Sequence, residues 1–134
     1  MAEKNDDIEV LWLYGSRAKG CATEISDYDF AVAFKNFGLS VSDKYLRPNL
    51  LAMDWSALLN IEESKLSVVD INAVPAYLGF NIVEYGDVLY QEPSMRRVIE
   101  MNRIFSQYEL PLIASQLLDN QLSEEKLKEN QVNE

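Results

Sequence analysis

The sequence contains no histidine and only one cysteine, Cys21, among its 134 residues. Without histidine, the chain has neither a histidine-dependent catalytic triad nor a histidine metal site. A single cysteine cannot form a disulfide within the chain, so we expect a reduced, cytoplasmic setting. Any general base in this protein is therefore most naturally a carboxylate.

Long hydrophobic runs and an excess of positive charge are also missing. No apolar stretch approaches the roughly 18 residues that a transmembrane helix needs, so no membrane span is expected. Residues 1–7 are polar and charged, unlike a secretory leader. With 22 acidic and 12 basic residues, the net charge is −10, which disfavours direct binding of nucleic acid. This charge allows a basic protein partner, although acidity alone indicates no more than solubility.

Length and periodicity predict a single α/β domain over residues 1–134. Strand-like runs at 8–14, 30–34, 66–72 and 88–91 alternate with helical patterns at 48–62, 76–85 and from Pro93 onward. We expect a small mixed β-sheet with helices packed mainly on one face. Pro48 is predicted in the first turn of its helix, and Pro111 is predicted to break the last one. Residues 119–134 are polar and are expected to be exposed helix or disorder.

The most informative stretch begins where the first strand ends, at Gly15 and Ser16. Glycine adopts backbone angles that other residues avoid and lets a ligand approach the backbone closely. Ser16 is a suitable N-cap for a short helix over 17–20, and the free amides of such a helix start attract phosphate. Arg17 and Lys19 lie at this point, where phosphate contact and simple solvation are equally compatible with the sequence.

Two carboxylates follow, at Asp27 and Asp29, where the second strand begins. Because side chains alternate along a strand, both point to the same face. Like charges placed side by side repel each other, and a fold gains nothing from them without a cation. We therefore favour metal binding over two merely solvated carboxylates, with Mg²⁺ as the expected ion for phosphoryl or nucleotidyl transfer.

The spacing Gly15-Ser16, ten residues, then Asp27-x-Asp29 resembles the signature of the nucleotidyltransferase superfamily with the DNA polymerase β-like palm. The short chain and the run Gly-Ser-Arg-Ala-Lys-Gly resemble the minimal nucleotidyltransferase (MNT) branch, whose members are typically antitoxins encoded beside HEPN toxins. The resemblance covers residues 11–74 well. Lys19 stands where related sequences often have arginine, which retains the charge but not the bidentate geometry.

The resemblance implies roles for individual residues. Gly15, Ser16, Arg17 and Lys19 would bind the nucleotide, while Asp27, Asp29 and Asp70 would be catalytic and hold one or two Mg²⁺ ions. Asp70 lies in the predicted third strand, between Val69 and Ile71, where a charge is costly unless it is paired or binds metal. A strand-end carboxylate or a pair with arginine is the alternative. The resemblance implies instead a general base that also binds the second metal.

The function implied by the resemblance is that of an antitoxin acting as a Mg-ATP-dependent protein adenylyltransferase. It would transfer AMP to a hydroxyl, expected to be a tyrosine, of a cognate HEPN RNase toxin and so neutralise it. One alternative is a non-catalytic antitoxin that blocks the toxin by binding, for which three carboxylates would be unnecessary. Another is a small-molecule nucleotidyltransferase of the aminoglycoside type, although such enzymes are generally longer.

Overall fold

The computed structural model describes residues 2–15 and 27–132, and its centre is a mixed sheet of four strands in the order β3-β2-β1-β4. The strands are β1 (Ile8–Tyr14), β2 (Tyr28–Phe34), β3 (Leu66–Asp70) and β4 (Asp87–Gln91). β1 runs antiparallel to both β2 and β4, whereas β2 and β3 are parallel. The predicted strands and the α/β fold class are confirmed.

Three α-helices accompany the sheet in the described residues: α1 (Val41–Leu59), α2 (Ala76–Tyr85) and α3 (Arg96–Val132). Two short 3₁₀ helices cover Ala2–Lys4 and Glu63–Lys65. α1 begins earlier than predicted, because the hydroxyl of Ser40 accepts a hydrogen bond from the backbone N–H of Asp43 at 3.1 Å. Pro48 consequently lies inside the helix rather than at its start.

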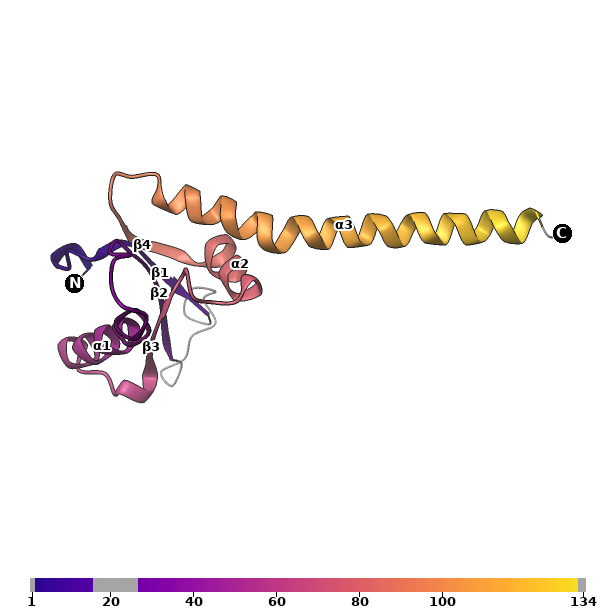
Figure 1. Cartoon of the computed structure of the whole chain (residues 1–134). Coiled ribbons are helices and arrows are strands. Elements are labelled where there is room, and N and C mark those ends of the chain that lie inside the picture. The colour runs from indigo at the N-terminus through magenta and orange to yellow at the C-terminus, as the bar shows by residue number, and fades with distance from the viewer. Residues whose placement is uncertain (1, 16–26, 133–134) are drawn as a thin grey trace.

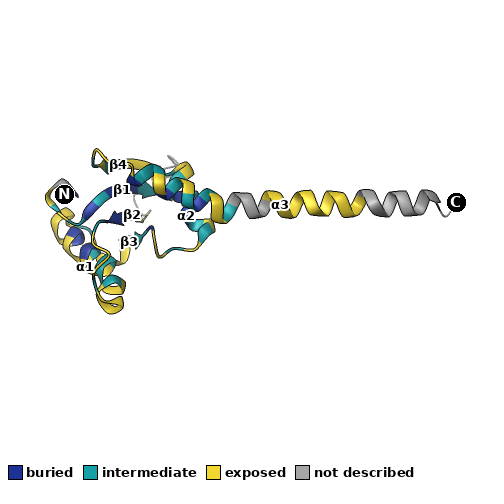
Figure 2. Cartoon of the chain, turned by 45° about the horizontal axis from the view of Figure 1, so that its top comes forward, coloured by how far each residue is buried: buried dark blue, intermediate teal, exposed yellow. Residues whose placement is uncertain are grey.

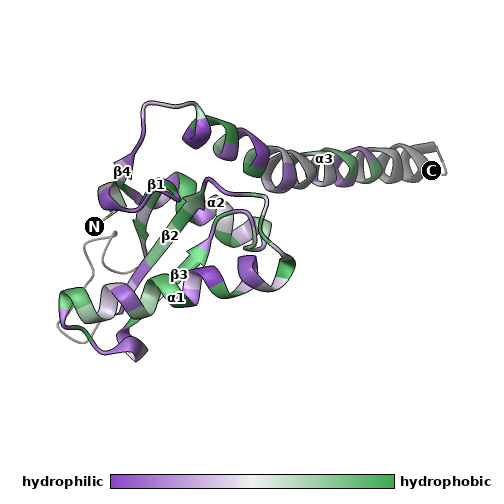
Figure 3. Ribbon diagram, turned by 60° about the vertical axis from the view of Figure 1, so that its left-hand side comes forward, coloured by the Kyte–Doolittle hydropathy of each residue, from purple (hydrophilic) through white to green (hydrophobic). Residues whose placement is uncertain are grey.

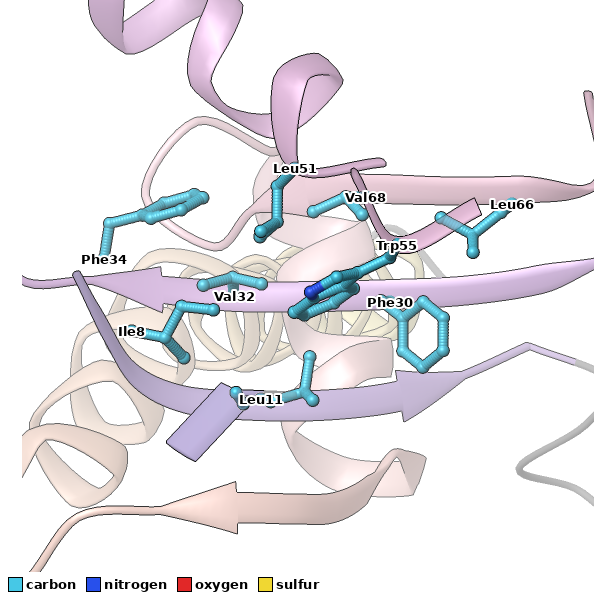
Figure 4. Packing of buried hydrophobic residues seen from close by; sticks show 10 residues of the cluster. Ile8, Leu11, Phe30, Val32, Phe34, Leu51, Trp55, Leu66 and Val68 are labelled. Atoms are coloured by element: carbon cyan, nitrogen blue, oxygen red, sulfur yellow. The ribbon is translucent and has the colours of Figure 1, made fainter. Parts of the chain in front are cut away.

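The sheet has a hydrophobic core on each face, so the prediction of helices mainly on one face needs correction. On one face, Leu51 and Trp55 of α1 pack against Phe30 and Val32 of β2 (Figure 4). On the other face, a second cluster joins the sheet to α2 and α3: Val10, Trp12, Ala31, Ala33, Ile71, Ile82 and Ile104. Figure 3 shows β2 hydrophobic along most of its length, as expected for a central strand covered on both faces.

A buried ionic cluster fastens the start of α3 to the sheet. The Arg96 guanidinium donates to Glu100 at 2.8 Å, to Glu9 at 3.1 Å and to the carbonyl of Phe34 at 2.8 Å. Burial alone raises the pKa of Glu100, but hydrogen bonds from Asn72, Arg103 and Arg96 outweigh it and lower the pKa below its ordinary value. The cluster therefore ties the first turn of α3 to Glu9 of β1 and to the end of β2.

Beyond its first turns, α3 projects from the body as a straight rod (Figure 1). The predicted break near Pro111 is wrong, because the helix continues through that position to Val132. Residues 113–123 are all exposed (Figure 2), so this part of the tail is exposed helix, one of the two predicted states. Over residues 2–15 and 27–132, no helix combines the length and apolarity needed to span a membrane.

Candidate functional site

The site is built at the point where β1 ends and β2 begins. Tyr14 and Asp29 are register partners on these antiparallel strands, and Gly15 follows directly with φ +75°. A Cβ at Gly15 would lie 2.6 Å from Oδ2 of Asp29, a distance that ordinary side chains do not reach. Glycine is therefore required here twice, once for the backbone angle and once to leave space for the carboxylate.

Asp29 lies in β2 and Asp27 directly precedes that strand, close enough for its charge to act on Asp29. That both carboxylates point to one face stays a prediction from the alternation of side chains. Asp27 is exposed and Asp29 is half-buried. Burial raises the pKa of Asp29, and the negative charge of Asp27 raises it further. Burial, together with the charge of Asp29, also raises the pKa of Tyr14 to about 12. This face therefore holds excess negative charge that a cation would relieve.

These two carboxylates suit Mg²⁺ in donor chemistry. Magnesium prefers oxygen ligands and is commonly bound by one or two carboxylates together with water and substrate phosphates. Burial and then the charge of Asp27 raise the pKa of Asp29, and both are penalties on its charged form that a bound cation would reduce. Within residues 2–15 and 27–132, no group of three acidic or cysteine side chains is placed to hold a metal. The described residues thus offer two carboxylates, and phosphate and water would contribute further oxygen ligands.

The three remaining nucleotide-binding predictions lie outside the described residues. Ser16, Arg17 and Lys19 belong to the segment 16–26, as does the predicted helix over 17–20. Of the predicted phosphate cradle, the structure describes Gly15 alone.

Asp70 does not join the other two carboxylates, and the expectation of three converging carboxylates is corrected here. Asp70 pairs in register with Val32, three positions beyond Asp29 on β2. Asp70 lies two residues after Val68, and side chains two apart on a strand point to the same face. Since Val68 packs in the cluster on the α1 side, Asp70 also faces α1, on the opposite side of the sheet from Asp29. There its Oδ2 lies 3.7 Å from the Arg47 guanidinium, and its Oδ1 accepts the N–H of Asn72 at 2.9 Å. The arginine pair considered as the alternative is the one observed.

The residue of β3 that does lie on the same face as Asp29 is Ser67, a position that no motif in the sequence marks. The two are register partners in the parallel β2–β3 ladder, and Ser67 is exposed between the buried residues Leu66 and Val68. The order Leu66, Ser67, Val68 alternates apolar, polar, apolar, and this pattern in the sequence could have indicated that Ser67 faces away from the core. Only the strand register, which the sequence does not reveal, places it beside Asp29.

Comparison with known proteins agrees with this geometry. Residues 1–94 match the family model described as polymerase beta, nucleotidyltransferase. The chain belongs to this nucleotidyltransferase family. The paired carboxylates and the glycine at the end of β1 lie inside the matched segment, so the sequence resemblance is confirmed at the level of the family.

One curated protein and several solved structures are also similar to this chain. A protein adenylyltransferase, MntA of Aphanizomenon flos-aquae (strain 2012/KM1/D3), is 28% identical over 88 residues, covering 64% of this chain and 59% of that protein. The match thus spans less than two thirds of the relative. A toxin–antitoxin structure with AMP-PNP superposes with a TM-score of 0.64 at 18% identity, over 90% of both chains. A tri-AMPylated HEPN toxin of Shewanella oneidensis in complex with MNT antitoxin gives 0.59 at 16% identity, over 92% of this chain and 89% of that one. At these identities the structures show the fold.

Proposed function

We propose that this nucleotidyltransferase is an antitoxin that transfers AMP from ATP to a hydroxyl of a HEPN toxin. The observation that carries the proposal is the carboxylate of Asp29, which the charge of Asp27 influences and which lies where a Cβ at Gly15 would come within 2.6 Å of its Oδ2. The names of its relatives support the choice of reaction: one is a protein adenylyltransferase, and one structure contains an AMPylated HEPN toxin. A tyrosine acceptor and a cytoplasmic setting stay predictions from the sequence.

Each residue of the site has a distinct role in this proposal. Asp27 and Asp29 would hold Mg²⁺, which when bound supplies positive charge to the triphosphate and to the leaving pyrophosphate. Gly15 keeps the end of β1 clear of the Asp29 carboxylate. Ser16, Arg17 and Lys19 would bind the phosphates, with backbone amides at the start of the predicted helix contributing. ATP is the proposed nucleotide, in keeping with the AMP-PNP held in a structure of similar fold.

The alternative is an antitoxin that blocks the toxin only by binding to it, and an experiment can distinguish this from AMP transfer. The test uses the full chain, the HEPN protein encoded beside it, and ATP labelled on the α-phosphate, with and without Mg²⁺. We expect label on the toxin and a mass gain of one or more AMP units. Asp29→Asn should reduce transfer at least about 100-fold, because it removes a charged metal ligand while keeping the side chain's shape.

Binding to the toxin is measured in parallel by pull-down, so that loss of transfer is not confused with loss of the complex. Asp6→Asn, which removes an exposed carboxylate far along the chain from the pair, serves as the control and should transfer normally. A wild-type chain that protects cells from the toxin and yet never adds AMP to it would establish the steric alternative.

A further inference from the structure

The parallel ladder between β2 and β3 brings a third side chain to the carboxylate face. Asp29 pairs in register with Ser67, and paired residues on neighbouring strands point to the same side of the sheet. The strands of a sheet lie about 4.8 Å apart, so side chains in such a pair are within reach of one molecule bound between them. Ser67 is exposed, which leaves its hydroxyl available to that molecule.

The side chains beside Asp29 on the two neighbouring strands determine which chemical groups this face of the sheet offers. On the β1 side stands Tyr14, whose pKa of about 12 keeps the phenol protonated at neutral pH. On the β3 side stands Ser67, while the one carboxylate of β3, Asp70, faces α1 and pairs with Arg47. Within β1, β2 and β3, the residues paired with Asp29 are therefore Tyr14 and Ser67, which both carry hydroxyls, and the carboxylate of Asp27 lies directly before β2.

We propose that Ser67 is a further residue of the transfer site, and that its hydroxyl contacts the acceptor or the α-phosphate opposite Asp29. This inference rests on the proposed function. In the reaction the acceptor oxygen forms a bond to the α-phosphorus, the bond from that phosphorus to the pyrophosphate oxygen breaks, and the acceptor proton passes to solvent. The hydroxyl of Ser67 forms a hydrogen bond that orients the reacting groups. It stays neutral throughout and does not act as a general base.

Two substitutions at Ser67 test its position and its role separately. Ser67→Ala removes the hydroxyl and should lower kcat/KM for AMP transfer roughly three- to tenfold, the loss expected for one neutral hydrogen bond. Its melting temperature should stay unchanged, because the side chain is exposed. Ser67→Asp places a third carboxylate beside Asp29 and should strengthen Mn²⁺ binding without nucleotide at least about tenfold, measured by calorimetry, since added ligand charge tightens such sites.

The control is Ser42→Asp, which adds the same charge at an exposed position in the first turn of α1 and should leave Mn²⁺ binding unchanged. Equal Mn²⁺ affinity in Ser67→Asp and wild type would overturn the placement of Ser67. Unchanged transfer by Ser67→Ala would overturn its role. If the wild-type chain transfers no AMP, the proposed function fails, while the Mn²⁺ titration still decides whether Ser67 faces the site.

Discussion

At the scale of single residues, the site depends on a carboxylate that the fold holds in an unfavourable place. Asp29 is half-buried beside Asp27, and both conditions disfavour its charged form. Gly15 contributes no side chain of its own, yet only glycine leaves the space that Oδ2 of Asp29 occupies. Such local cost is typical of functional positions, where the arrangement serves a ligand rather than stability.

We expect Asp29→Asn to raise stability at neutral pH even as it removes activity. The pKa of Asp29 is higher in the folded chain than its ordinary value of 3.8, so the folded state loses stability as pH rises above that value. Asparagine removes this penalty, and solvent screening limits the gain to about 1 kcal/mol or less. Below pH 3.8 both states are protonated and the gain should disappear.

Thermal unfolding of Asp29→Asn and wild type at several pH values, in chelator to exclude metal, measures this difference. Asp6→Asn is the matched control, because it removes one exposed carboxylate elsewhere. A stability gain that grew toward acid pH would contradict the expected direction of the pKa shift.

Residue types and spacing predicted the carboxylate pair and the glycine but not the complete face. The pairing of Asp27 and Asp29 was predicted from their spacing of two residues, which is a local feature of the chain. The partner of Asp29 on β3 depends on the register between two strands, which is set by packing of the whole sheet. A carboxylate among apolar residues indicated that Asp70 needs a partner, and the family resemblance favoured a metal as that partner over an arginine, but the structure places Arg47 beside it.

At the scale of elements, the ion pair between Asp70 and Arg47 joins β3 to α1. Each side chain is 11% exposed, and the guanidinium also donates to Asp7 at 3.0 Å and lies 4.0 Å from the centre of the Phe34 ring. A buried arginine that loses one carboxylate partner is left partly uncompensated. The pair therefore holds the helix that covers one face of the sheet.

We expect Asp70→Asn to destabilise the fold while leaving the carboxylate face intact. The loss should be about 1–3 kcal/mol, because Arg47 retains Asp7 and the carbonyl of Asn36 as partners. Metal binding should match wild type, since Asp70 faces the opposite side of the sheet from Asp29. Urea unfolding and Mn²⁺ calorimetry on the same samples measure both, and weakened Mn²⁺ binding in a stably folded variant would return Asp70 to the metal site.

Element boundaries show where sequence patterns lose precision. α2 was predicted at its observed bounds because Pro75 and Gly86 limit it in the sequence itself. α1 was predicted to start seven residues too late and to end three residues too late, since Pro48 resembles a helix start while the Ser40 cap is the true one. Pro48 is half-buried within α1, and it removes one N–H donor without ending a helix that packing on the sheet stabilises.

At the scale of the whole molecule, the chain consists of a packed body and a projecting helix. Ile104 of α3 is 1% exposed within the core, whereas residues 113–123 are all exposed along the rod in Figure 1. Isolated helices gain little stability from their own hydrogen bonds in water. The folding free energy of this molecule should therefore come from the body and the first turns of α3.

Deletion of residues 113–134 tests this division. We expect the melting temperature to change by less than about 3 °C, because residues 113–123 are all exposed and neither described core cluster includes a residue that the deletion removes. Helical circular dichroism should fall, since a large part of α3 is removed. A longer deletion from residue 104 onward removes the buried Ile104 and should lower the melting temperature strongly, because loss of a core isoleucine costs roughly 2–5 kcal/mol. If the shorter deletion destabilised the protein as much as the longer one, the rod would have to contribute directly to the folded body.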